Sequence, residues 1–205
     1  MNLDDWYLIW VSICIGLVIV AFSPLVMAYI PKGREQFFAL AVLGEEGMAE
    51  QYFPNDDINI EIGEQVRWQI YLYNHMGKAR YVSVKFKILN STMISANSTL
   101  CSASVAPMIY EVRKVLLDDE ALIFPLQWSL QNITTYMNIT SIDRIIMNEK
   151  VIQTYVEAKN ERTFRIVIEL WVYEMEQGDF IFGWTSGKET RCAWNQIWFN
   201  TTTTN

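Results

Sequence analysis

The sequence predicts a mainly β protein, with a single N-terminal transmembrane helix followed by an Ig-like antiparallel β-sandwich. Two observations predict this fold class. An uncharged apolar stretch opens the chain, and many later segments alternate between apolar and polar residues with a period of two. The expected organisation is an anchor with a short N-terminal tail over 1–34, an extracytoplasmic sandwich over 35–200 and a tail over 201–205.

The anchor prediction rests on the segment from Trp6 to Ile30, which has 25 residues and no charge. A helix of that length spans ~37 Å at about 1.5 Å per residue, against a hydrocarbon core of roughly 30 Å. A cleaved signal peptide would have a basic start and a shorter apolar core, whereas this start carries Asp4 and Asp5. A buried core helix is a further alternative, but such a long uncharged run favours a retained membrane span.

The side of the membrane is indicated by two opposing signals. Lys32 and Arg34 follow the apolar stretch, and positive charges favour the cytoplasmic side. Five N-x-[ST] sequons favour the exterior, and all five have Thr in the third position: Asn90, Asn97, Asn132, Asn138 and Asn200. These residue types are also common in turns, which is the alternative explanation. We expect several of the sequons to be glycosylated, which places the domain outside the plasma membrane.

Cysteine usage agrees with an exterior location. Cys14 lies within the anchor, so Cys101 and Cys192 are the only pair in the domain. In an oxidising compartment they are expected to form a disulfide, which closes a loop worth ~4–5 kcal/mol in the chain-entropy model. Two buried free thiols are the alternative.

Three segments carry the clearest strand pattern. Apolar residues expected to face the core alternate with outward-facing ones over 65–73, 82–88 and 164–173, and the alternation continues over 180–184. Ser83, Lys85 and Lys87 are expected to face outward. The other predicted strands are 36–43, 58–62, 109–117, 121–129, 149–158 and 191–199.

Turn signals separate these segments and predict an antiparallel arrangement. They include 44–47, 74–77 and 177–179, each with glycine. The Asn- and Thr-rich stretches 90–104 and 131–141 are predicted to be loops that carry sequons, and 140–150 is predicted to have room for a short helix. Many short strands with regular turns are typical of a sandwich, although the Cys–Trp–Cys spacing of antibody domains is absent.

Four segments of the sequence resemble a known family. They are the stretch from Phe38 to Pro54, which contains Gly-Glu-Glu-Gly-Met-Ala-Glu-Gln-Tyr-Phe-Pro, the pair Gly63-Glu64, the pair Asn74-His75 and the segment 169–172. Together they resemble the archaeal domain-of-unknown-function family numbered sixteen-sixteen. The resemblance covers about 36–175. It departs from the family in having one membrane helix and in Phe53, which separates Tyr52 from Pro54. It implies an archaeal, membrane-anchored, Ig-like exterior domain and no particular reaction.

The residues offer little for catalysis, and no cofactor is expected. His75 is the only histidine, no Gly-x-Ser-x-Gly motif occurs, and the net charge of −7 disfavours nucleic acid as a partner. A Cys–His dyad with Cys101 or Cys192 is conceivable, but both thiols suit a bridge better. Asn55-Asp56-Asp57 is the best calcium candidate, without EF-hand spacing, and His75-Met76 is a weak copper candidate.

Aromatic side chains outside the predicted core point to a binding role. Tyr71, Tyr73, Trp171 and Tyr173, and also Tyr81, fall on outward faces of the predicted strands. Either they form a contact surface, since Tyr and Trp anchor interfaces, or a second layer covers them. The leading prediction is a non-catalytic accessory or structural subunit that docks other membrane or cell-surface proteins in a hetero-oligomeric assembly. The alternatives are an extracytoplasmic hydrolase and a ligand or copper-binding carrier.

Overall fold

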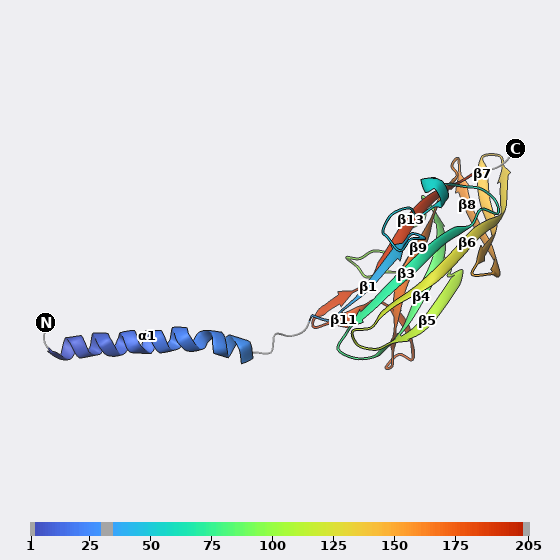
Figure 1. The fold of residues 1–205 in the computed structure, drawn as a ribbon. Coiled ribbons are helices and arrows are strands. Elements are labelled where there is room, and N and C mark those ends of the chain that lie inside the picture. Colours follow the sequence, from blue (N-terminus) through green and yellow to red (C-terminus); the bar gives the residue numbers. More distant parts are fainter. Residues whose placement is uncertain (1–2, 30–34, 203–205) are drawn as a thin grey trace. The chain divides into compact units, whose positions relative to one another are not determined.

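The computed structural model describes residues 3–29 and 35–202 (Figure 1). The chain divides into two compact units, residues 1–34 and 35–205, which are described separately. Predictions that fall on 30–34, including the charges Lys32 and Arg34, and on 203–205 of the tail lie outside the described residues.

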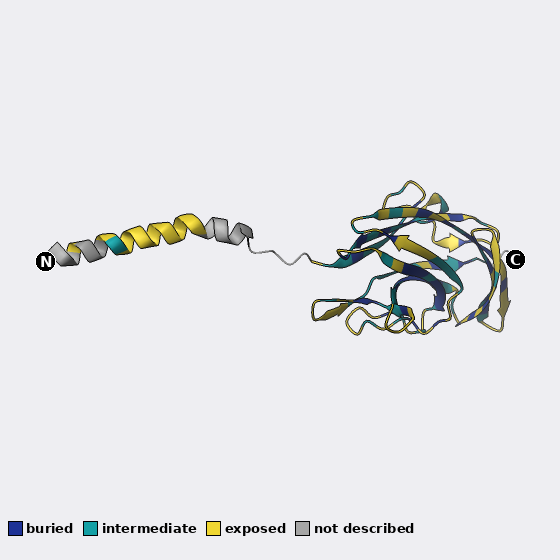
Figure 2. Cartoon of the chain, turned by 90° about the horizontal axis from the view of Figure 1, so that it is seen from below, coloured by how far each residue is buried: buried dark blue, intermediate teal, exposed yellow. Residues whose placement is uncertain are grey.

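The first unit contains helix α1 (Leu3–Tyr29). Its side chains are described at Trp6 and over 10–22, where nearly all are exposed (Figure 2). Trp6 and Trp10 lie one turn apart with ring centroids at 6.4 Å. Within the described part of the chain, no helix meets the combined length and apolarity needed to cross a membrane.

The second unit is a two-sheet sandwich, so the prediction of a mainly β protein with antiparallel sheets is confirmed for residues 35–202. Sheet A has the order β1 (Phe37–Leu43), β3 (Val66–His75), β6 (Ala121–Tyr136), β7 (Ile139–Met147) and β8 (Lys150–Lys159). Sheet B has the order β2 (Asn59–Ile60), β13 (Trp194–Thr201), β9 (Thr163–Glu174), β4 (Arg80–Asn90) and β5 (Tyr110–Leu116), with β10 (Asp179–Phe182) also paired to β9. Among these described pairs only β13 with β2 is parallel. A separate hairpin joins β11 (Trp184–Ser186) to β12 (Glu189–Arg191), and a 3-10 turn covers Pro54–Asp56.

The sandwich has two distinguishable ends. The proximal end is where β1 begins, because Phe37 pairs with His75 at the end of β3. The turn after β3, the β5–β6 turn and the β9–β10 turn lie at this end. The distal end contains the β6–β7 turn, the end of β8 and the end of β13.

The core between the sheets is formed by the apolar residues that the alternation assigned to it. Val66, Trp68, Ile70 and Leu72 of β3 are at most 1% exposed. Trp68 packs edge-on against Trp128 at 5.4 Å, and its Nε1 donates to the carbonyl of Tyr52 at 2.6 Å. Because a buried indole N–H loses its hydrogen bond to water, this bond to Tyr52 stabilises the position of the segment after β1 against the core.

Two local predictions in sheet A are wrong. Residues 131–141 are not a loop and 140–150 is not a helix; they form the end of β6, the whole of β7 and two tight turns. A bulge lies between Ile142 and Arg144, so Ile142 and Ile145 both face the core although they are three residues apart. That spacing imitates a helical repeat. The threonines of 131–141 are compatible with a strand, because Thr is β-branched and β-branched residues favour strands.

The outward face of β4 is also different from the prediction. Ser83 is 0% exposed and Lys87 is 5% exposed, although both were expected to face solvent. The 91–109 connection between β4 and β5 folds over this face, where Ala106 packs with Leu89 of β4 and Val167 of β9. The predicted loop at 90–104 is therefore present, and it covers the central strands of sheet B.

The predicted strand 180–184 is interrupted at Gly183, where β10 ends and β11 begins. Gly183 has φ of +95°, and a Cβ atom there would lie 2.5 Å from the carbonyl oxygen of Arg191. Only glycine fits such a close approach in this conformation. The break directs Trp184, 5% exposed, back into the core against Phe38 at 5.1 Å.

The turn after β3 is held by one buried amide. Asn74 is 0% exposed, and its Nδ2 lies within 3.1 Å of the carbonyl oxygens of Lys78, Leu116 and Leu117. Its Oδ1 accepts from Met76 N at 3.1 Å.

Replacing Asn74 with Leu is expected to lower the free energy of unfolding by about 2–4 kcal/mol, because buried backbone groups lose their partners. Urea unfolding followed by tryptophan fluorescence measures this, and Lys78→Leu, at an exposed position of the same turn, is the comparison.

Candidate binding surface

Aromatic and cationic side chains gather on the outer face of sheet B, where β4, β5, β9 and β10 lie side by side. This set, called the sheet B patch, comprises Tyr81, Lys85, Glu111, Arg113, Trp171, Tyr173, Phe180 and Phe182. The strand register brings them together: Tyr173 pairs with Phe180, Trp171 with Phe182, and Lys85 with Glu111. Tyr81 is 38% exposed and the Arg113 side chain 52% exposed, so the patch reaches solvent.

Rings and cations in the patch are stacked. The Lys85 ammonium lies 3.6 Å from the centroid of the Trp171 ring, and the Arg113 guanidinium lies 4.9 Å from that of Phe180. Tyr81 contacts Phe180 at 5.0 Å and Tyr173 at 5.8 Å between centroids. Such cation–π and aromatic pairs restrict the side chains before any partner arrives, which reduces the entropy lost on binding.

Electrostatics within the patch follow from partial burial. Burial lowers the pKa of Lys85 below its ordinary value. Burial also opposes ionisation of Glu111, but hydrogen bonds from Arg113 and Ser83 outweigh it, so the pKa of Glu111 lies below the usual range. Arg113 lies 2.9 Å from Glu111, and Ser83 Oγ donates to the same carboxylate at 2.6 Å. The patch therefore holds a fixed carboxylate between two cations.

Beneath the covering connection, a buried ion pair supports one ring of the patch. Glu169, 0% exposed, lies 3.0 Å from the Lys87 ammonium and accepts from both the backbone N and the Oγ of Ser104, at 2.7 and 2.6 Å. Lys87 also donates to the Ser104 carbonyl at 2.8 Å. Trp171 Nε1 donates to Glu169 at 3.0 Å, so this carboxylate sets the position of the indole that Lys85 stacks on.

The two domain cysteines lie next to each other on the same face. Both are half-buried and unbridged in this structure. Burial raises the pKa of the Cys192 thiol, and its hydrogen bond with Cys101 raises it further, to about 12. The Cys192 sulfur also lies 3.9 Å from the carbonyl oxygen of Asn97, within the covering connection. A disulfide at this position, which stays a prediction, would attach that connection to the segment before β13.

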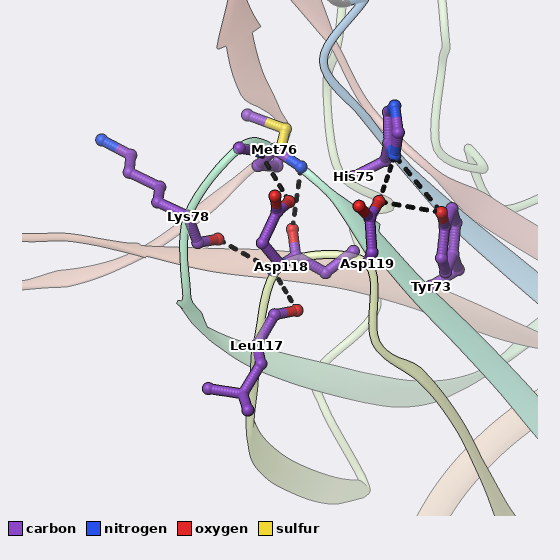
Figure 3. A network of polar contacts seen from close by, with 9 residues as sticks. Tyr73, His75, Met76, Lys78, Leu117, Asp118 and Asp119 are labelled. Carbon is purple, nitrogen blue, oxygen red and sulfur yellow. Dashed lines mark hydrogen bonds and ion pairs between the residues drawn. The ribbon is translucent and has the colours of Figure 1, made fainter.

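The four tyrosine and tryptophan residues predicted as an interface fall on two opposite faces. Trp171 and Tyr173 of β9 belong to the sheet B patch, whereas Tyr71 and Tyr73 of β3 lie on the outer side of sheet A. Tyr73 donates to Asp119 at 3.0 Å, and Asp119 lies 2.5 Å from His75 Nδ1. Figure 3 shows these three side chains pointing toward one another at the proximal end.

The residues considered for metal binding lie in different settings. Asp57 accepts from the backbone and side-chain nitrogens of Asn59, at 2.9 and 2.7 Å. Asp56 lines an open cavity of about 580 Å³ together with Glu45, Glu46 and Arg67. Arg67 pairs with Glu45 at 2.9 Å. Met76 is 1% exposed and packs in the core, and the described residues contain no group of three His, Cys, Asp or Glu side chains suited to a metal.

The five sequons occupy different settings. Asn97, Asn132 and Asn138 are exposed, whereas Asn90 and Asn200 are half-buried at the distal ends of β4 and β13. Asn138 lies in the two-residue β6–β7 turn with φ of +66°.

Several residues of the sheet B patch are not predicted by the sequence pattern. Phe180 could have been placed opposite Tyr173 from the Gln177-Gly178-Asp179 turn, which predicts a hairpin register. Lys85, Glu111 and Arg113 come from strands whose pairing depends on the long 91–109 connection. No local signal in the sequence predicts that β5 lies beside β4.

Comparison with known proteins gives only distant similarity. No family model and no curated protein matches this chain. Among solved structures, it is similar to a CARDB domain from Pyrococcus furiosus determined with di-metal ions, with 8% identity and a TM-score of 0.39 over 82% of this chain and 90% of that one. A beta-glucosidase from Listeria innocua aligns at 9% identity and a TM-score of 0.39 over 81% of this chain but only 16% of its own length. The C-terminal domain of wzt aligns at 7% identity and a TM-score of 0.37 over 86% and 82%.

Proposed function

We propose that this chain is a non-catalytic, membrane-anchored subunit whose exterior Ig-like domain docks another membrane or cell-surface protein through the sheet B patch. The observation that carries the proposal is the stack of Lys85 on Trp171 and of Arg113 on the buried ring of Phe180, at a face where Arg113 and Tyr81 reach solvent. Arg, Tyr and Trp dominate interface hot spots, and pre-ordered side chains lose little entropy when a partner binds.

Anchoring and orientation are supported by the sequence. The uncharged stretch Trp6–Ile30 has the length of a membrane span, and the five sequons favour an exterior domain. The resemblance to an archaeal membrane-anchored family suggests a larger archaeal membrane enzyme complex or a cell-surface layer as the assembly. The carboxylate Glu111 between two cations favours a partner with both charged and aromatic groups at its contact face.

The test is to purify the full chain from its native membrane in mild detergent and identify the proteins that accompany it by mass spectrometry. Stoichiometric partners are expected. Arg113→Ala is then expected to weaken the assembly about 30-fold, the effect of losing ~2 kcal/mol at a hot spot.

Arg67→Ala is a closely matched control for Arg113→Ala. Arg67 lies on the outer side of sheet A, its side chain is 53% exposed, and it pairs with Glu45 at 2.9 Å, whereas Arg113 is 52% exposed and pairs with Glu111 at 2.9 Å. Only the Arg113 variant is expected to release the partner. Equal retention of partners by both variants would exclude the sheet B patch as the docking face, and a chain that purifies alone would contradict the subunit role.

A further inference from the structure

We infer that the five sequons differ in their ability to carry a glycan: Asn97, Asn132 and Asn138 bear sugars in the folded protein, whereas Asn90 and Asn200 do not. This inference rests on the exterior location in the proposed function, and it adds which sites are modified. It follows from the hydrogen bonds of each side-chain amide, because glycosylation replaces one hydrogen on Nδ2 with a bulky sugar.

Asn200 is held on both sides within sheet B. It lies on β13 between β9 and β2. Its Oδ1 accepts from Thr163 Oγ1 at 2.9 Å, and its Nδ2 donates to Asn59 Oδ1 at 3.2 Å. The Asn59 amide in turn donates to Asp57. Because both ends of the Asn200 amide are bonded, it is not free to turn toward solvent, and a sugar on its second Nδ2 hydrogen would have to fit at a half-buried position between β9 and β2.

Asn90 is fixed by four hydrogen bonds at the end of β4. Its Nδ2 donates to the carbonyl oxygen of Glu157 on β8 at 2.6 Å. Its Oδ1 accepts from Thr92 N, Thr92 Oγ1 and Met93 N at 2.9, 3.0 and 2.8 Å. Turning the amide to make room for a sugar would break these bonds. They hold both the 91–109 connection and strand β8 of sheet A against the end of β4.

The other three amides have room for a substituent. Within residues 35–202, no hydrogen bond from the Nδ2 of Asn97 or Asn138 is present, and both residues are exposed. Asn97 uses only its Oδ1, which accepts from Thr99 N at 2.8 Å and Leu100 N at 3.0 Å. Asn132 Nδ2 reaches Asp143 at 3.5 Å, at the limit of a hydrogen bond. A sugar on these residues would break few or no hydrogen bonds of the folded protein.

The chemistry of transfer is the same at every sequon. The Asn amide nitrogen forms a bond to the anomeric carbon of a lipid-phosphate-linked oligosaccharide. The carbon–oxygen bond to phosphate breaks, the lipid phosphate leaves with the electron pair, and one amide proton passes to a base of the transferase. Selection among the sites therefore comes from the acceptor chain, since chains modified at Asn90 or Asn200 fold poorly and are removed.

The test is glycopeptide mass spectrometry on the full chain purified from its native membrane, which gives the fraction of each asparagine that is modified. Majority occupancy is expected at Asn97, Asn132 and Asn138, with occupancy at least tenfold lower at Asn90 and Asn200. In intact-mass measurements Asn138→Gln is expected to remove one glycan mass, whereas Asn200→Gln leaves the glycan mass unchanged.

The outcomes separate this inference from the proposed function. Occupancy of Asn90 or Asn200 comparable with that of the exposed sites overturns the inference and leaves the exterior location intact. A chain without sugar at any sequon overturns both the inference and the sequon argument for an exterior domain. Docking through the sheet B patch is decided separately, by co-purification with the Arg113 and Arg67 variants.

Discussion

Glu169→Ala is expected to lower the free energy of unfolding of the sandwich domain by about 3–5 kcal/mol, because it leaves the buried Lys87 ammonium without its counter-charge. Glu169 is 0% exposed and receives hydrogen bonds from Ser104 and Trp171 as well as the ion pair with Lys87. Urea unfolding of the full chain in detergent, followed by tryptophan fluorescence, measures the change through the transition midpoint.

Two comparison variants make this prediction specific. Glu157→Ala removes an exposed carboxylate from β8 and is expected to change the free energy of unfolding by less than about 0.5 kcal/mol. The double variant Lys87→Met with Glu169→Leu removes both charges and is expected to be more stable than Glu169→Ala alone. If Glu169→Ala unfolds at the same urea concentration as the wild type, the ion pair has no structural role.

Removing the Cys101–Cys192 bridge is expected to destabilise the domain by about 4–5 kcal/mol in the chain-entropy model, since the bridge would close a loop of roughly 90 residues. Peptide mapping without reductant is expected to yield a single peptide pair joined through these cysteines. Cys101→Ser should then unfold at lower urea, and reductant should have no further effect on this variant.

Cys14→Ser serves as the control, because Cys14 lies in α1 and outside the sandwich. Reductant should destabilise the Cys14 variant as much as the wild type.

The raised pKa of Cys192 keeps its thiol protonated at neutral pH, so in the reduced native protein it is expected to react slowly with alkylating reagents. Rapid labelling of both domain cysteines in unreduced, unfolded protein would show that no bridge forms.

The sequence predicted the strands whose two faces differ in polarity along their whole length. In β3 every second residue is buried, from Val66 to Asn74, and the period-two pattern identified both the strand and its inward face. The pattern failed in β7, where a bulge shifts the alternation by one residue. It also failed for the outward face of β9, where Arg165, Val167 and Glu169 are buried because a distant connection covers them. Single-sequence periodicity contains no information about such long-range covering.

The candidate site was predicted only in part. Outward-facing aromatic residues identified Trp171 and Tyr173, but grouping them with Tyr71 and Tyr73 required knowing which strands share a sheet. The cations that stack on the rings, Lys85 and Arg113, were not identified because their strands are brought together by strand order rather than by local sequence. Lys85 and Lys87 looked equivalent in the pattern, yet one reaches the patch and the other lies in the buried ion pair.

The position of β9 and β13 in sheet B has a consequence for the order of events during synthesis. β9 lies at the centre of sheet B, pairs with β4 and β13, and begins only at Thr163. While the chain is being made, the edge of β4 that pairs with β9 has no partner until residues 163–174 have been added. Sheet B is therefore expected to close late, after its last strand β13 has been made. Until then the sequon asparagines already made, Asn90 among them, are expected to be accessible to modifying enzymes, and the later closure of the sheet decides whether an added group is tolerated.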